Sequence, residues 1–350
     1  MTKKVKERVL VALSGGVDSA VTLSLLKKAG YAVEAAFMKN FSEKINIKGE
    51  CPWKEDRLMA YRVAAHLKIP IQTFDFENQY HEKIVNYIFK SYQAGLTPNP
   101  DVLCNNEIKF KLFLEHAIKM GFDKIATGHY AKIKKTKDFY QLCRGKDPSK
   151  DQSYFLAGLK QTQLSRAIFP VGDKLKTTVR RLAKQAKLPN ADRKDSQGIC
   201  FIGKIDLKTF LSQKIKPQIG DIVDTQGHKL GTHQGVWYYT IGQRKGLDIG
   251  GSGPWYVVAK DIKNNQLVVG HIDDDKLYNK SVQISELHWL GKKYPLPLKA
   301  QGQIRYRQPA QDLTLYPDKA EFKKAQQGVA SGQTLAVYNK NELIASATII

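Results

Sequence analysis

Short apolar runs alternate with stretches of helical periodicity over roughly the first 212 residues. The apolar runs, which predict buried strands, are Arg8–Leu13, Val33–Met38, Ile69–Phe76 and Lys124–Thr127. The periodic stretches, which predict helices, are Ala20–Ala29, Glu55–Lys68, Tyr80–Ala94 and Ile108–Met120. This order predicts an α/β domain whose parallel sheet is covered by helices on both faces. Such sheets bind ligands at the carboxyl ends of their strands, near the point where strand order reverses.

From about Gly220 onward the pattern becomes rich in strands. The expected strands are Val236–Ile241, Trp255–Lys260, Gln266–Gly270, Leu298–Arg307, Leu313–Tyr316 and Thr334–Tyr338, with a hairpin turn at Asn264-Asn265. This second part predicts one or two small antiparallel β domains or barrels.

The net charge of +23, from 56 Lys and Arg against 33 Asp and Glu, predicts a polyanionic partner. Nucleic acid is favoured over an anionic membrane, because no apolar run approaches the ~18 residues of a spanning helix. The apolar stretch Val9–Leu13 is too short for the core of a signal peptide, so we expect the protein in the cytoplasm. Four cysteines in 350 residues are too few for a disulfide scaffold, and the absence of a CxxC pair disfavours a zinc ribbon.

Between the first strand and the first helix lies the sequence SGGVDS, residues 14–19. Its two glycines allow a sharp turn and close approach to a ligand, and the N–H groups that open the following helix attract an anion. The hydroxyls of Ser14 and Ser19 can donate to that anion, and Asp18 can hold a hydrated magnesium ion. The pattern is not a Walker A loop, since no Lys follows the glycines. The alternative is a plain turn between strand and helix.

Two further segments place a cysteine in a short polar sequence. In the first, residues 97–105, two prolines predict an extended loop that brings Asp101 and Cys104 together just before a helix, whose N-terminus would lower the pKa of the thiol. In the second, residues 194–202, the preceding Arg193 and Lys194 would favour a thiolate at Cys200. The alternatives are that Cys104 caps a loop and that Cys200 belongs to the core.

The SGGVDS sequence resembles the PP-loop of the ATP pyrophosphatase superfamily, whose members cleave ATP between its α- and β-phosphates. Taken with TPNPDVLCN, GHY, KDQSYFL, DSQGICFIG and TIGQRKGL, in that order along the chain, it resembles the bacterial tRNA-specific 2-thiouridylases. RYRQ and SGQ extend the resemblance almost to the C-terminus. Gln197 departs from the pattern, which more often has Thr there.

The resemblance implies a PP-loop ATP pyrophosphatase domain over residues 1–212, a small central β domain over 213–278 and a β-barrel over 279–350. It implies ATP-dependent adenylation of the C2 oxygen of the wobble uridine, position 34, in tRNAs for Lys, Glu and Gln. Sulfur from a cysteine desulfurase relay then replaces the oxygen, with AMP and pyrophosphate released.

The same resemblance assigns residues to this reaction. Cys200 would carry the sulfur as a persulfide, Cys104 would be its partner thiol in a disulfide, and Asp101 would be the acid or base. Whether the persulfide attacks directly or releases hydrosulfide stays open. ATP, with Mg²⁺ near Asp18, would lie on Ala12, Leu13, Ser14, Gly15, Gly16, Val17, Asp18, Ser19, Met38 and Gly128. The target base would meet Asn99, Pro100 and Asp101, and the tRNA would contact Lys150, Asp151, Gln152, Arg305 and Tyr306.

The predicted helix Lys174–Lys187 places Arg180, Lys184 and Lys187 on one face. A solvated helix face is the ordinary interpretation, but the basic surroundings favour a stripe that follows RNA phosphates. Two other functions remain open: an amide-forming PP-loop ligase for a small molecule, and a non-catalytic RNA-binding protein. The first leaves the charge unexplained, and the second has no use for two cysteines in polar segments. The missing CxxC disfavours an iron–sulfur thiolase.

Overall fold

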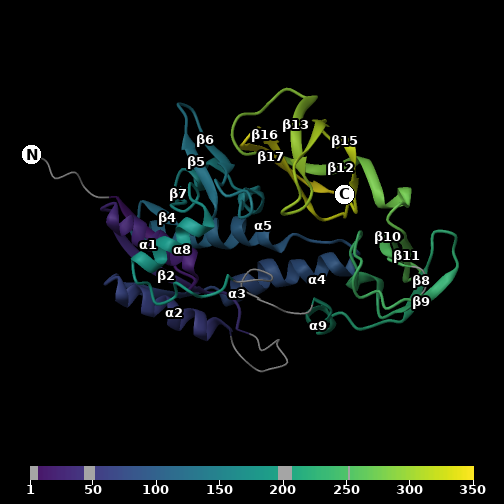
Figure 1. Cartoon of the computed structure of the whole chain (residues 1–350), viewed down its shortest axis with the longest axis horizontal. Coiled ribbons are helices and arrows are strands. Elements are labelled where there is room, and N and C mark those ends of the chain that lie inside the picture. Colours follow the sequence, from purple (N-terminus) through teal and green to yellow (C-terminus); the bar gives the residue numbers. More distant parts are fainter. Residues whose placement is uncertain (1–6, 43–51, 196–206, 251–252) are drawn as a thin grey trace, which may run out of the picture.

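The computed structural model describes residues 7–42, 52–195, 207–250 and 253–350. Figure 1 shows three parts: a sheet-and-helix domain, a small green β region and a yellow barrel at the C-terminal end of the chain. The α/β domain followed by β-rich domains is the architecture that the sequence predicts.

A five-stranded parallel sheet forms the centre of the first domain, in the order β3-β2-β1-β4-β7. Its strands are β1 (Arg8–Ala12), β2 (Ala32–Lys39), β3 (Ile71–Asp75), β4 (Lys124–Ala126) and β7 (Ala167–Ile168). Strand order runs outward from β1 to β3 on one side and to β4 and β7 on the other. The order therefore reverses between β1 and β4, and ligands of such sheets bind beyond the carboxyl ends of these two strands.

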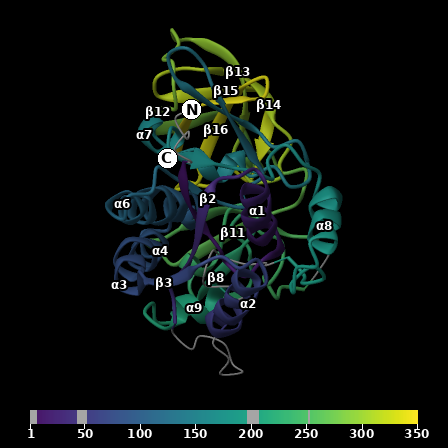
Figure 2. The same cartoon turned by 90° about the vertical axis from the view of Figure 1, so that its left-hand side faces the viewer.

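Both faces of this sheet are buried, because alternate side chains of a strand point to opposite faces. Val9 and Val11 of β1 pack with α1 (Val17–Lys28), α2 (Pro52–His66) and α8 (Lys176–Gln185). Leu10 and Ala12 belong to the cluster that includes the helices of the opposite face. In Figure 2, α1 and α8 lie on one side and α3 (Glu77–Tyr80), α4 (Asn86–Gln93) and α6 (Phe113–Lys119) on the other.

Two helical stretches on that second face are longer than predicted. The first runs from α3 through η1 (His81–Val85) into α4, and the second from α5 (Pro100–Cys104) through η2 (Asn105–Leu112) into α6. The prediction of an extended loop up to residue 105 is wrong, because Pro100 opens a helix that Asn99 caps. Proline is well tolerated at the first helical position, where its missing N–H is not needed.

The central β domain contains a four-stranded sheet in the order β10-β11-β8-β9. Its elements are α9 (Leu207–Ser212), β8 (Gly220–Val223), β9 (Lys229–His233), η4 (Val236–Tyr238), β10 (Tyr256–Asp261) and β11 (Gln266–Gly270). The turn at Asn264-Asn265 is confirmed, but the strand predicted over Val236–Ile241 is a short helical turn. Tertiary contacts override the β propensity there: the Val236 N–H donates to Asn265 Oδ1, and the Tyr238 hydroxyl donates to the Ile215 carbonyl.

The C-terminal strands close into a six-stranded barrel, since the first strand, β12, also pairs with the last, β17. The strands are β12 (Tyr278–Trp289), β13 (Leu298–Gln303), β14 (Gln311–Leu315), β15 (Lys319–Gln327), β16 (Thr334–Asn339) and β17 (Glu342–Ile349), preceded by η5 (Asp275–Leu277). A hairpin from the first part of the chain, β5 (Ala131–Lys135) and β6 (Tyr140–Arg144), joins this sheet through β17. The barrel sheet is thereby continuous with a hairpin from the first part of the chain.

The remaining elements are η3 (Ser153–Leu156) and α7 (Gln161–Leu164), which follow that hairpin. None of the helices in the described ranges is long and apolar enough to cross a membrane.

Candidate nucleotide and thiol site

The predicted phosphate loop, residues 14–19, leaves the carboxyl end of β1 and opens α1. Gly15 has φ +81°, a left-handed conformation that glycine adopts without strain. The Ser14 N–H donates to Ser19 Oγ (3.2 Å), and Ser19 Oγ donates to the Gly16 carbonyl (3.0 Å). The loop therefore holds its own shape through the serines that the sequence singles out.

Gly128 follows the neighbouring strand β4 and packs directly against this loop. A Cβ atom there would lie 2.8 Å from both the carbonyl carbon of Asp18 and the nitrogen of Ser19. Met38 is buried near the carboxyl end of β2, on the other side of β1. The residues predicted to bind ATP thus gather at the ends of three adjacent strands, where strand order reverses.

The N-terminus of α1 has the properties of a phosphate site. The helix is twelve residues long, and Gly16 before it has no side chain to cap the first N–H groups. Phosphate oxygens can accept from these groups and are stabilised by the helix dipole. This end of the sheet therefore offers backbone donors to an anion.

Two side chains to which the sequence analysis assigns no role hold Asp18: Lys176 and Tyr130, the last residue of the GHY motif. Lys176 Nζ lies 2.7 and 2.9 Å from the two Asp18 carboxylate oxygens, and the Tyr130 hydroxyl donates to one of them at 2.8 Å. The Lys176 side chain is only 13% exposed. Burial and the charge of Asp18 raise the pKa of Tyr130, so its hydroxyl stays a donor. A partly buried ammonium therefore stands beside the phosphate loop.

Lys176 also joins the loop to Asp195, which it contacts at 2.8 Å. Asp195 pairs in addition with Lys150 (2.7 Å) and Arg180 (2.5 Å). Burial alone would raise the pKa of Asp195, but hydrogen bonds and charge from Lys150 and Lys176 outweigh it and lower the pKa to about 2. Asp195 is thus an anion held by three cations.

The segment that ends at Asp195 packs on the phosphate loop as well. The Gly15 carbonyl accepts from Asn190 Nδ2 (2.9 Å) and Arg193 Nη1 (3.2 Å), and Arg193 pairs with Asp56 of α2 at 2.5 Å. The next residues, 196–206, lie outside the described residues and include Cys200. The meeting of Cys104 with Cys200 therefore stays a prediction.

Cys104 occupies the last position of α5 and is fully buried. It lies four residues inside a helix that continues into η2, so the expectation that it directly precedes a helix N-terminus is wrong. Asp101 lies one turn earlier in α5 and is partly exposed. Asn99 is buried, and its Oδ1 accepts from the Val102 N–H at 3.3 Å. The predicted target-base segment is therefore the capped start of a helix.

Residues predicted to contact tRNA are mostly engaged within the protein. Lys150 pairs with Asp195, and Gln152 Oε1 accepts from the Tyr130 N–H at 3.0 Å. The Asp151 carboxylate accepts from Arg144 (2.9 Å), the Gly145 N–H (2.9 Å), and the Ser153 N–H (3.1 Å) and hydroxyl (3.0 Å). Asp151 thus fixes the loop that carries its neighbours.

The predicted tRNA-binding residues of the barrel, and Arg180 of α8, are also engaged within the protein. Arg305 donates to the carbonyls of Ile241 and Gly328, and Tyr306 packs on Phe155 with ring centroids 4.3 Å apart. On α8, Arg180 turns inward to the carbonyls of Ala191 and Arg193 and to Asp195.

Beyond Arg180, the basic stripe is exposed. Lys184, with a side chain 64% exposed, pairs with Asp192, and Lys187 is exposed just after the helix. Lys184 and Lys187 are thus the members of the predicted stripe that face solvent.

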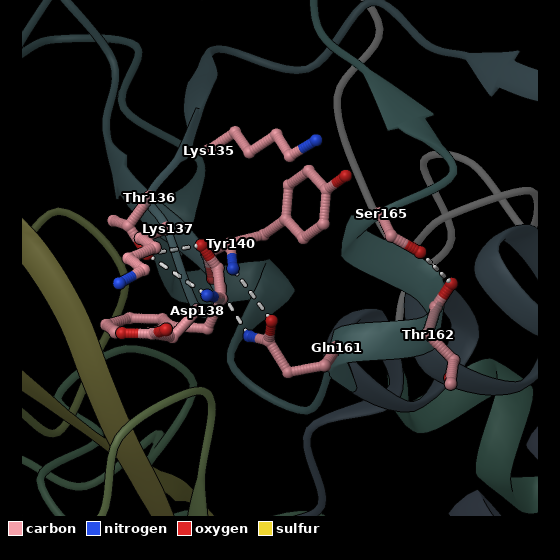
Figure 3. A pocket seen from close by; sticks show the side chains of 9 residues that line it. Lys135, Thr136, Lys137, Asp138, Tyr140, Gln161, Thr162 and Ser165 are labelled. Carbon is pink, nitrogen blue, oxygen red and sulfur yellow. Dashed lines mark hydrogen bonds between the residues drawn. The ribbon is translucent and has the colours of Figure 1, made fainter.

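A cavity of about 310 Å³ lies between the tip of the β5–β6 hairpin and α7, and Figure 3 shows its lining. Gln161 lines this cavity and links α7 to the hairpin: its side chain accepts from the Tyr140 N–H (2.8 Å) and donates to the Tyr140 carbonyl (2.9 Å). Its lining contains none of the predicted site residues.

A glycine-rich phosphate loop at the reversal point of a parallel sheet is typical of nucleotide-binding HUP domains. Consistent with this class, a tRNA methyl transferase HUP domain model matches residues 7–204. A tRNA methyl transferase PRC-barrel domain model matches residues 208–271, and an aminomethyltransferase β-barrel domain model matches residues 279–349.

Curated relatives resemble the whole chain. It is 45% identical over 350 residues to tRNA-specific 2-thiouridylase MnmA 2 of Geobacillus kaustophilus (strain HTA426), covering 98% of this chain and 94% of the relative. It is 43% identical over 357 residues to the MnmA of Shouchella clausii (strain KSM-K16), covering 100% and 98%. The chain belongs to the MnmA family of tRNA-specific 2-thiouridylases, which confirms the resemblance found in the sequence motifs.

Proposed function

We propose that the protein is an ATP-dependent tRNA-uridine 2-sulfurtransferase that converts the wobble uridine of tRNAs for Lys, Glu and Gln to 2-thiouridine. The observation that carries this proposal is the phosphate loop at the strand-order reversal, in a chain 45% identical to a named 2-thiouridylase over nearly its whole length. The excess of 56 basic over 33 acidic residues suits a tRNA substrate.

ATP supplies the AMP group that turns the C2 oxygen of uridine into a leaving group. The N–H groups that open α1 would hold its phosphates, the ammonium of Lys176 would add positive charge beside them, and Gly128 leaves room for the loop that binds them. No group of three or more metal-ligating side chains is present among the described residues. A magnesium ion would therefore be held chiefly by phosphate oxygens and water, with Asp18 as the protein carboxylate.

The sulfur would reach the tRNA from a persulfide on Cys200, loaded by a donor protein of a cysteine desulfurase relay. Its terminal sulfur attacks C2, and AMP leaves with the original oxygen. The Cys104 thiolate then attacks the Sγ atom of Cys200, which releases the C2 thiocarbonyl and leaves a Cys104–Cys200 disulfide. The transferred sulfur is reduced by two electrons, the two cysteines are oxidised by two electrons, and a thiol reductant restores them. Release of free hydrosulfide is the alternative route.

Within this scheme Asp101, one turn before Cys104 in α5, is the acid or base beside the uridine, with Asn99 and Pro100 at the start of the same helix. Lys150, Gln152, Arg305 and Tyr306, which are partly exposed, would supply the inner part of the tRNA surface, with Asp151 fixing the loop between them. Lys184 and Lys187 of the α8 stripe would add an exposed edge. Because its substrate is tRNA, we place the protein in the cytoplasm.

A cysteine series tests this function. Cys200→Ser is expected to abolish 2-thiouridine formation, while tRNA-dependent AMP release continues, because adenylation needs no thiol. Cys104→Ser is expected to block thiolation but still to accept labelled sulfur on Cys200. Cys143→Ser is the matched control, because Cys143 is buried in β6 and has no assigned role. Normal thiolation by Cys200→Ser would disprove the persulfide route.

A further inference from the structure

The C-terminal barrel forms hydrogen bonds with the segment that leads into α5. The Thr97 N–H donates to the Ser331 carbonyl at 2.8 Å, in the loop before β16. Gln333 Nε2 donates to the carbonyls of Thr97 and Pro98, both at 3.0 Å. A Cβ atom at Gly332 would lie 2.9 Å from the Thr97 carbonyl oxygen, so the two backbones touch. The residues just before the capped start of α5 are therefore fixed to the barrel.

Tyr154 makes a second connection to the same place. Its hydroxyl, buried in η3, donates to the Thr334 carbonyl of β16 at 2.9 Å and accepts from Asn99 Nδ2 at 3.3 Å. The other side-chain atom of Asn99, Oδ1, accepts from the Val102 N–H and caps α5. The side-chain NH₂ group of Asn99 thus binds Tyr154, and its side-chain oxygen caps the helix.

These contacts form one path from the barrel to the reacting residues: β16, the Tyr154 hydroxyl, the Asn99 amide and the first turn of α5. Asp101 and Cys104 both lie on that helix, within five residues of Asn99. We propose that Tyr154 is a positioning residue, which sets the orientation of α5 through Asn99 and so aligns Asp101 and Cys104 with the reacting uridine. This inference rests on the proposed function, because it takes the roles of Asp101 and Cys104 from it.

Removal of the Tyr154 hydroxyl tests the path. Tyr154→Phe keeps the packed ring and deletes only the hydroxyl, which contacts Asn99 and the carbonyls of Thr334 and Ile304. We expect the kcat for thiolation to fall at least about tenfold, because small displacements of reacting groups have large effects on rate. The KM for ATP is expected to stay at the wild-type value, since the phosphate loop lies on α1 and not on α5.

Tyr338→Phe is the matched control. Its hydroxyl is also fully buried between the barrel and the first domain, where it lies 3.1 Å from Ser153 Oγ, but it makes no contact with Asn99. We expect both variants to lower the melting temperature by similar amounts and only Tyr154→Phe to slow thiolation. Asn99→Ser, which keeps a capping oxygen but loses the amide, is expected to slow it equally, with no further loss in the double variant.

Equal thiolation rates in Tyr154→Phe and Tyr338→Phe would overturn the positioning role, as would additive losses from Asn99→Ser and Tyr154→Phe. The wild-type protein separates this from a failure of the proposed function. If the wild-type protein itself forms no 2-thiouridine, the function is wrong. If it does and Tyr154→Phe matches it, only the positioning role is wrong.

Discussion

Adding a single methyl group at Gly128 should impair the use of ATP while leaving the protein folded. Its Cβ would lie 2.8 Å from two backbone atoms of the phosphate loop, whereas ordinary contact begins at 3.4 Å. Because both atoms belong to the main chain of Asp18 and Ser19, no side-chain rotation relieves the clash. Either β4 or the loop must therefore move, by about 0.6 Å if ordinary contact at 3.4 Å is to be restored.

A shift of that size occurs at the N–H groups assigned to the phosphates. Misplacement of a reacting group by about 1 Å costs on the order of 10²-fold in rate. For Gly128→Ala we therefore expect kcat/KM for ATP to fall roughly 10- to 100-fold, with a loss of stability of about 1–3 kcal/mol from overpacking. The fold should survive, because Gly128 lies beyond the carboxyl end of β4 and not within the packed part of the sheet.

The assay is tRNA-dependent pyrophosphate release over a range of ATP concentrations, together with thermal unfolding. Gly158→Ala is the matched control, because its added Cβ would meet only Asn106 side-chain atoms at 3.5 Å or more. Wild-type ATP kinetics in Gly128→Ala would refute the placement of the phosphates at this loop.

Three further variants test other parts of the site. Asp18→Ala is expected to abolish tRNA-dependent pyrophosphate release with little change in tRNA affinity, which a filter-binding assay would measure alongside. The double variant Lys184→Glu/Lys187→Glu should lower the affinity for all tRNAs alike. It should also reduce the salt dependence of binding, because the logarithm of the affinity falls with the logarithm of the salt concentration in proportion to the number of phosphates contacted. Asp195→Asn should lower the unfolding free energy at pH 7 by about 1 kcal/mol: the depression from 3.8 to about 2 corresponds to roughly 2.4 kcal/mol, and partial exposure reduces it. A depressed pKa stabilises the fold above pH ~4, so this difference from wild type should vanish as the pH falls toward about 2, and Asp192→Asn, 85% exposed, should show almost none of it.

Local sequence patterns predict those parts of the structure that are formed by residues close together in the chain. The strand β1, the phosphate loop and α1 follow one another within the span from residue 8 to residue 28, so periodicity and glycines are enough to place them. The prediction of a loop at the start of α5 is wrong, although Pro98 and Pro100 favour an extended backbone. The cap that Asn99 supplies, with Pro100 at the first helical position, supports a helix instead.

Contacts between distant residues explain the rest. Asp18 and Lys176 are separated by 158 positions, and no spacing rule connects them. The β5–β6 hairpin has short apolar–polar alternation of its own, but its place beside β17 depends on contacts between residues as far apart as Gln141 and Glu342, 201 positions along the chain. The inward orientation of Arg180 likewise depends on its hydrogen bond to Asp195, which tertiary packing places beside Lys176 and the phosphate loop.

The most direct test of the central claim is nucleoside mass analysis of tRNA after incubation with the wild-type protein, ATP, magnesium and a sulfur-loaded cysteine desulfurase relay. We expect 2-thiouridine at the wobble position of tRNAs for Lys, Glu and Gln, formed only when ATP is present and matched by one AMP per thiolated tRNA. Absence of 2-thiouridine under these conditions, or its formation without ATP, would contradict an ATP-dependent 2-sulfurtransferase.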